Sequence, residues 1–203
     1  MRQKNKNGGR HWRVSVCLLL TGSLVLLMLV LIFWFSAQDA TKSSDLSGGI
    51  SEKIARALGW LMAPGGSREE LNQWSEWLET PVRKLAHFTE YMVLSVLTCL
   101  HGLVIRIAVG KRTVCYESRR EALYGFLPLL ATAVIFCVCY AMTDELHQYF
   151  VPGRSCRLFD VGVDSLGVLV GAVLFLLTVR TQKVKIWIKW MKGPENMPAS
   201  QKG

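Results

Sequence analysis

The residues of this sequence that could do chemistry lie in three short stretches, each beside a long apolar run. A charge at mid-membrane costs about 2.5 to 3.5 kcal/mol, so an ionisable side chain there usually marks a functional site or an ion pair. In the first stretch Lys84, His87 and Glu90 share one helix face with Tyr91, within an arc of about 120°. A histidine three residues from a carboxylate suits proton transfer or metal binding.

The second stretch shows the same kind of face at the end of another apolar run. Asp144, His147 and Gln148 fall within about 100° of arc on a helix, while Glu145 points aside. A Pro-Gly pair then ends the helix, and the turn presents Arg154. These residue types again suit acid–base chemistry or anion binding.

The third stretch begins the last long apolar run. Asp160, Asp164, Gly167 and Gly171 lie within about 60° of arc on a helix. A carboxylate face therefore continues into a face of small residues, which lets another helix pack closely.

The elements that must position these stretches are apolar and long. Of the 203 residues 51% are hydrophobic and only 19% are charged, which excludes a disordered chain and a highly charged soluble module. A crossing needs about 20 apolar residues. We therefore predict an all-α integral membrane four-helix bundle, with spans at about residues 14–35, 85–109, 123–142 and 161–179.

The long connection between the first two spans carries two amphipathic segments. Apolar residues recur at helical spacing in both, and a capping box of Ser67 and Glu70 precedes the second. We expect two helices that lie on the outer leaflet or cap the bundle. The apolar positions are Ile50, Ile54, Ala57, Leu58, Leu61, Leu71, Trp74, Trp77 and Leu78.

The charge distribution predicts the orientation. There are 24 Lys and Arg residues against 15 acids, and most of the basic residues flank the termini and the junction between the second and third spans. The positive-inside rule then places a basic N-terminus (1–13) and a basic tail (181–203) in the cytoplasm, on either side of a membrane domain at 14–180. All three polar stretches fall at the outer boundary, and nucleic-acid binding is not needed to explain the charge.

These motifs together resemble the VanZ-like family of bacterial membrane proteins. The resemblance covers about residues 30–180, including Phe35-Ser36-Ala37-Gln38, and departs from the family where Asp164 replaces an Asn that is frequent there. It implies a multi-pass protein of the bacterial cell membrane with a role in the envelope. The family takes its name from a glycopeptide-resistance cluster and is associated with lowered susceptibility to teicoplanin, a lipid-tailed antibiotic.

Three functions remain open from the sequence. A pocket in the outer leaflet could bind a lipid-linked cell-wall precursor or a lipoglycopeptide, with Lys84 and Arg154 contacting its anionic group. A hydrolase or transferase could act there on a lipid-linked substrate, with a divalent metal as a candidate cofactor held by His87, Glu90, Asp144 and His147. The clusters could also only brace the bundle. The predicted pocket residues are Lys84, His87, Glu90, Asp144, Glu145, His147, Gln148, Arg154, Asp160 and Asp164.

Overall fold

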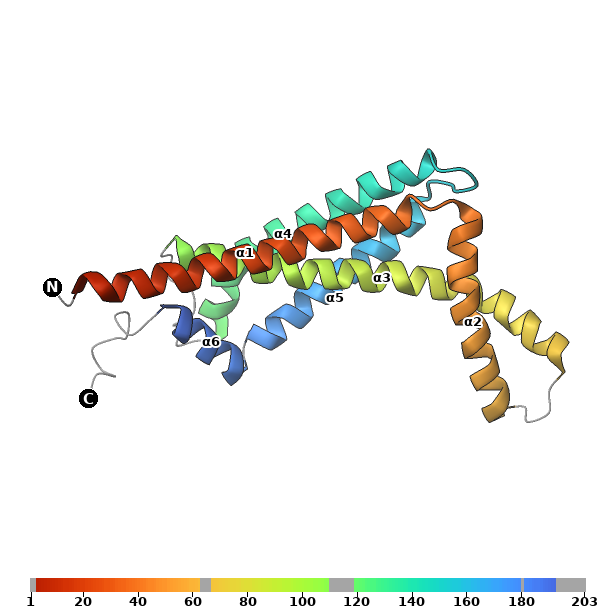
Figure 1. Ribbon diagram of the computed structural model, residues 1–203, viewed down its shortest axis with the longest axis horizontal. Helices are drawn as coiled ribbons and strands as arrows, with labels where there is room; N and C mark the ends of the chain where they lie inside the picture. The colour runs from red at the N-terminus through yellow and green to blue at the C-terminus, as the bar shows by residue number, and fades with distance from the viewer. Residues whose placement is uncertain (1–2, 63–66, 110–118, 180, 193–203) are drawn as a thin grey trace.

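The computed structural model describes residues 3–62, 67–109, 119–179 and 181–192. Parts of the expected basic tail and of the basic junction between the second and third spans therefore lie outside the described residues. The described chain is all-α and holds six helices (Figure 1): α1 (Gln3–Ser36), α2 (Ala40–Met62), α3 (Arg68–Ala108), α4 (Arg119–Tyr149), α5 (Leu158–Val179) and α6 (Gln182–Lys192).

Among the described residues, four helices are long and apolar enough to cross a membrane, which confirms the predicted fold class. They run side by side along the long axis of the molecule (Figure 1), while α2 crosses them at one end and α6 lies at the other. The segments that meet this criterion are longer than the apolar runs alone: His11–Ser36, Arg68–Ala108, Gly125–Tyr149 and Leu158–Val179.

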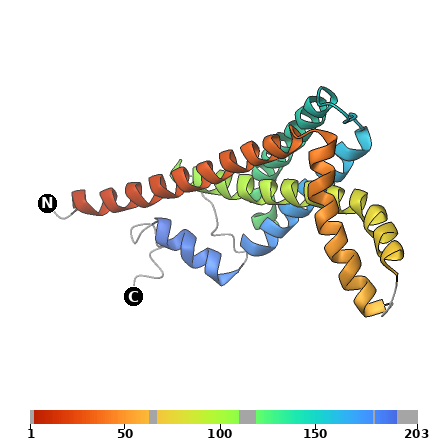
Figure 2. The same cartoon turned by 45° about the vertical axis from the view of Figure 1, so that its right-hand side comes forward.

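The second amphipathic segment does not form a separate helix. It continues through Pro81 into the second span, so that α3 is a single helix of 41 residues. The predicted capping box begins it: Ser67 Oγ accepts from the Glu70 N–H at 3.2 Å, and the Ser67 N–H donates to Glu70 Oε2 at 2.8 Å. The first turns of α3 and the whole of α2 form a hairpin that leaves the bundle (Figure 2).

Asp39 begins α2 as its N-cap. Its Oδ1 accepts from the Lys42 N–H at 2.9 Å and from the Thr41 hydroxyl at 2.8 Å. The bond from the Lys42 backbone, followed by the bond from Thr41, lowers the pKa of the Asp39 carboxyl below its ordinary value. A charged cap of this kind fixes the direction in which the chain leaves α1.

The closest helix contact joins α3 and α5, as the small-residue face predicts. A Cβ added at Gly167 would collide with the carbonyl oxygen of Phe88, and one added at Gly171 would collide with that of Met92. Ser95 adds a polar link across this contact, because its hydroxyl donates to the Val168 carbonyl at 2.8 Å. These contacts fix how far the polar beginning of α5 lies from α3.

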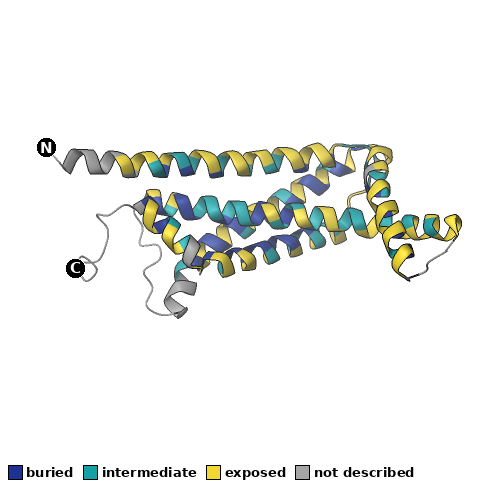
Figure 3. Ribbon diagram, turned by 60° about the horizontal axis from the view of Figure 1, so that its bottom comes forward, coloured by how far each residue is buried: buried dark blue, intermediate teal, exposed yellow. Residues whose placement is uncertain are grey.

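The α1 helix is the most exposed of the four long helices (Figure 3). Only 11% of the residues in its most apolar segment are buried. Two polar contacts hold it inside the apolar region. Thr21 Oγ1 lies 2.8 Å from His101 Nδ1 on α3, and the Tyr140 hydroxyl of α4 donates to the Leu29 carbonyl at 2.7 Å. His101 therefore links α3 to α1 inside the apolar region.

The end of the bundle where α1 begins is closed by α6. Ile188 and Met191 of α6 are buried in one apolar cluster with Val14 and Cys17 of α1. The guanidinium of Arg13 lies 5.3 Å from the centre of the Trp190 ring. The polar stretches lie at the opposite end of the molecule, beside α2 (Figure 1).

Candidate functional site

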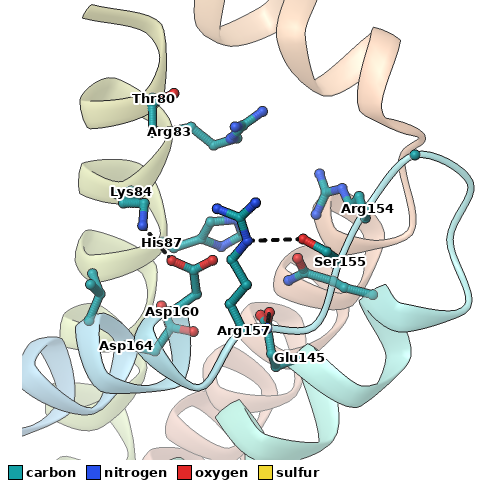
Figure 4. A pocket seen from close by; sticks show the side chains of 13 residues that line it. Thr80, Arg83, Lys84, His87, Glu145, Arg154, Ser155, Arg157, Asp160 and Asp164 are labelled. Atoms are coloured by element: carbon teal, nitrogen blue, oxygen red, sulfur yellow. Dashed lines mark hydrogen bonds and ion pairs between the residues drawn. The ribbon is translucent and has the colours of Figure 1, made fainter.

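A polar cavity of about 330 Å³ lies where α3, α4 and α5 meet the connection between α4 and α5. Figure 4 shows its side chains directed inward from these separate parts of the chain. The convergence of three distant stretches at one end of the bundle is therefore present in the structure. The lining residues are Thr80, Arg83, Lys84, His87, Glu145, Gln148, Gly153, Arg154, Ser155, Arg157, Asp160, Val163 and Asp164.

Most, but not all, of the predicted pocket residues line this cavity. Glu90, Asp144 and His147 do not, because each faces another neighbour, as described below. The predicted residues that the structure brings around the cavity are Lys84, His87, Glu145, Gln148, Arg154, Asp160 and Asp164.

The wall between α3 and α5 is closed by an ion pair. Lys84 Nζ donates to Asp160 Oδ1 at 2.6 Å, and each side chain is 31% exposed. The ammonium also lies 4.3 Å from the centre of the Phe159 ring. Lys84 is thus already neutralised by a carboxylate, which reduces its availability for the anion contact that the sequence suggests.

The connection between α4 and α5 is held in shape by two local features. The Arg154 N–H donates to the Val151 carbonyl at 3.1 Å, and Gly153 has φ of 76°, which fits a Pro-Gly type II turn. At the other end, the Arg157 N–H donates to Glu145 Oε1 at 2.7 Å. Glu145 is almost fully buried, so the carboxylate that points aside on α4 anchors the beginning of α5.

Asp144 and Gln148 form a buried polar network with the end of α1. Ser36 Oγ donates to Asp144 Oδ2 at 2.8 Å, and Gln148 Nε2 donates to the same oxygen at 3.2 Å. Ser36 is fully buried. The network therefore fixes α1 to α4, and only Gln148 of the two α4 residues also reaches the cavity.

His87 and Glu90 form a pair on α3. His87 Nδ1 lies 3.3 Å from Glu90 Oε2, and both side chains are about four-fifths buried, with 20% and 21% exposed. His87 lines the polar cavity, whereas Glu90 lines a shallow apolar groove that also includes Met28 and Leu85. The pair thus lies between a polar cavity and an apolar groove on the surface of the helix bundle.

The predicted metal set is not assembled. His147 stacks on Phe33 of α1, with ring centres 4.6 Å apart, and Asp144 also faces α1, while His87 and Glu90 pair on α3. In the described ranges no group of three or more His, Cys, Asp or Glu side chains is suitable to hold a metal ion. The sequence pattern placed both i, i+3 pairs on helices correctly, but it could not show that they face different partners.

Among the residues at or near the site that were not predicted, three add charge or a buried hydrogen bond. Arg83 and Arg157 line the cavity, but by sequence they count only as basic residues of the connections. Ser36, the partner of Asp144, lies outside the three polar stretches. Its place in the short Phe-Ser-Ala-Gln motif directly after the first span is the one sequence signal that marks it.

Comparison with known proteins gives one match. The sequence model of the family described as VanZ/LLP1 matches residues 22–179. This range begins inside α1 and ends with α5, so it contains the whole cavity. No curated protein and no solved structure matches the chain.

Proposed function

This chain belongs to the VanZ/LLP1 family, and on that premise we propose that it is an envelope protein of a bacterial cell membrane with both termini in the cytoplasm. The four spanning helices and the basic residues around α6 and the beginning of α1 support this orientation. The cavity lies at the other end of the bundle, so in this orientation it opens at the outer boundary of the membrane.

The cavity engages the polar headgroup of an amphiphilic or lipid-linked envelope ligand, such as a lipid-linked wall precursor or teicoplanin. The observation that carries this proposal is its position. A polar space of about 330 Å³ lies at the end of an apolar bundle, where a headgroup would join its hydrocarbon chain. The α3 and α5 helices form its walls and continue as apolar helices into the membrane.

Three of the carboxylates at or near the cavity have partners that reduce their repulsion of an anionic headgroup, while Asp164 also lines the cavity. Asp160 is paired with Lys84, and Asp144 accepts hydrogen bonds from Ser36 and Gln148. Glu145 accepts from the backbone of Arg157. Partnered acids repel an approaching anion less than free acids do, because hydrogen bonds and ion pairs offset their charge.

Antibiotic susceptibility tests this function. We would express the chain in a glycopeptide-susceptible bacterium and measure inhibitory concentrations of teicoplanin and of a glycopeptide without a lipid tail. The protein should raise the value for teicoplanin more, and Arg154→Gln should abolish the effect. Lys53→Gln, an exposed residue of α2, is the control at equal membrane abundance. An effect that survives Arg154→Gln, or is equal for both antibiotics, would contradict a role for this cavity.

A membrane-embedded hydrolase or transferase is the second candidate, favoured by the His87 and Glu90 pair at the cavity wall. Glu90 would orient the imidazole, and His87 would accept a proton from a nucleophile in the cavity. Product release from a lipid-linked substrate that His87→Gln abolishes would support this function. The metal-dependent form also requires metal that copurifies with the protein.

A bracing role for the clusters has a distinct signature. If Glu90→Gln, His147→Ala and Arg154→Ala lower thermal stability but leave the susceptibility phenotype intact, the polar residues only hold the helices together. The binding proposal requires the reverse for Arg154, whose hydrogen bond to the end of α1, to the Phe35 carbonyl, is long at 3.4 Å.

A further inference from the structure

Three arginines surround the opening of the cavity. Arg83 comes from α3, and Arg154 and Arg157 come from the connection between α4 and α5. Figure 4 shows the three side chains extending toward the same opening from its two sides. Such an arrangement places planar donor groups around one space, which is how proteins usually bind oxyanions.

None of these guanidinium groups is neutralised. In the part of the chain that the structure describes, no carboxylate lies within ion-pair distance of Arg83, Arg154 or Arg157. Within the described residues the Arg157 side chain donates to Ser155 Oγ at 3.1 Å, and the Arg154 side chain donates to the Phe35 carbonyl at 3.4 Å. Most N–H donors of these three guanidinium groups are therefore free to bind a ligand.

The positive charge of Arg83 also acts on Arg154. Burial first, and the positive charge of Arg83 second, lower the pKa of the Arg154 guanidinium below its ordinary value. Arg154 is thus partly desolvated next to a like charge. An anion between the two side chains would remove this repulsion and replace the lost hydration.

We propose that the cavity binds a phosphoryl group, a phosphate or diphosphate, through Arg83, Arg154 and Arg157. The inference rests on the proposed function and names the chemical class of the ligand's headgroup. A carboxylate offers two oxygens and one charge, which a single guanidinium fork satisfies. A phosphoryl group offers three acceptor oxygens in different directions and up to two charges, which three forks from two sides can satisfy.

The acids of the cavity lie on other parts of its wall. Glu145 comes from the end of α4, and Asp160 and Asp164 come from the beginning of α5. Glu145 and Asp160 already have partners, so the arginines are the groups that attract an anion into the cavity.

Binding measurements on the purified full chain in a maltoside detergent, which contains no phosphate, test the proposal. The probes are inorganic phosphate, pyrophosphate, dihexanoyl phosphatidic acid and, as a lipid without phosphate, dihexanoylglycerol. We expect pyrophosphate and phosphatidic acid to bind and dihexanoylglycerol not to bind. Arg83→Gln, Arg154→Gln and Arg157→Gln should each weaken binding about tenfold, the loss expected for charged hydrogen bonds.

Matched variants separate the site from general effects. Lys53→Gln removes a positive charge from α2 outside the cavity and should leave affinity unchanged. Arg83→Lys and Arg154→Lys keep the charge but lose the fork, so they should bind less well than the wild type even where a Gln variant fails to fold. Equal affinity in the wild type and in the Lys and Gln variants would overturn the proposal.

The source of the phosphoryl group is read from the same data. Tighter binding of phosphatidic acid than of phosphate indicates a lipid headgroup, and equal binding indicates a free anion. If no phosphoryl probe binds while the susceptibility phenotype is present, this inference is wrong and the proposed function stands. If the probes bind and the phenotype is absent, the phosphoryl site stands and the link to glycopeptides is wrong.

Discussion

Lys84 and Asp160 join α3 to α5 through an ion pair of 2.6 Å at the wall of the polar cavity. The two residues are far apart in the sequence, and each begins the polar face of its own helix. The pair therefore sets two properties together, the closure of the wall and the amount of positive charge that remains inside the cavity.

We expect substitutions of Lys84 and Asp160 to have opposite effects on anion binding. Asp160→Asn frees the Lys84 ammonium, so we expect about three- to tenfold tighter binding of pyrophosphate, as a nearby unit charge gives at an intermediate dielectric. Lys84→Met leaves the Asp160 carboxylate unpaired and should weaken binding by a similar factor. Calorimetric titration measures both. Because both side chains are 31% exposed, stability should change by only about 0.2 to 1 kcal/mol. A shift in the same direction for both variants would contradict this assignment.

We expect a substitution at Gly153 to displace Arg154. Its φ of 76° is unfavourable for a β-branched residue, by about 1 to 2 kcal/mol, so Gly153→Val should deform the turn. Pyrophosphate affinity should fall while the melting temperature of the bundle changes little, since the turn lies outside the spans. Pro152→Ala, which can keep the turn, is the control. Unchanged affinity in Gly153→Val would show that the turn does not position Arg154.

Ser36 predicts a stability effect at the contact between α1 and α4. Ser36→Ala removes a buried donor to Asp144, and the loss of a hydrogen bond to a charged group costs about 1.5 to 3 kcal/mol. Thermal unfolding in detergent should show a lower melting temperature. Ser23→Ala is the matched control, because Ser23 is exposed on the same helix. Equal melting temperatures of the two variants would argue against the network.

Gly167 predicts a packing effect between α3 and α5. In Gly167→Ala the new methyl group meets the Phe88 carbonyl, so the helices must separate, at a cost of about 1 to 3 kcal/mol for overpacking. Gly162→Ala, on the same helix with no atom within 4 Å of the added Cβ, should be neutral or slightly stabilising. The measurement is thermal unfolding of both variants. Similar curves would mean that close approach at Gly167 does not limit stability.

Asp39 predicts a pH dependence of stability. Its pKa is lowered in the folded protein, so its contribution is present above the unfolded pKa, near 4, and is lost as the pH falls through the lower folded value. The difference in melting temperature between the wild type and Asp39→Asn should shrink over this range. Asp45→Asn, an exposed position on α2, is the control. A difference that grows on acidification would contradict the sign.

The sequence predicts the parts of this fold that depend on local pattern. Apolar runs give the four spans, and the Gly167 face gives the close contact with α3. Each span carries the chain to the other side of the membrane, so the order of the spans also brings the three polar stretches to one end of the bundle. These predictions need only the helical period and the length of a crossing.

The remaining features depend on which neighbour each helix face meets. By spacing, Asp144 and His147 share a helix face with Gln148. The end of α1 packs against that face, where Ser36 bonds to Asp144 and Phe33 stacks on His147. Arg157 reaches the cavity because Glu145 holds its backbone. Such pairings join residues of different helices, and periodicity within one helix carries no information about them.

The unbroken course of α3 through Pro81 has a mechanical consequence. At about 1.5 Å per residue its 41 residues measure about 60 Å, twice the thickness of the hydrocarbon layer. The helix is therefore longer than one crossing needs, and its first turns, which bend away from the bundle beside α2 (Figure 2), continue directly into the part that carries Arg83 and His87. The hairpin and the wall of the cavity therefore share one continuous helix, so a displacement of the hairpin would reach Arg83 without an intervening loop.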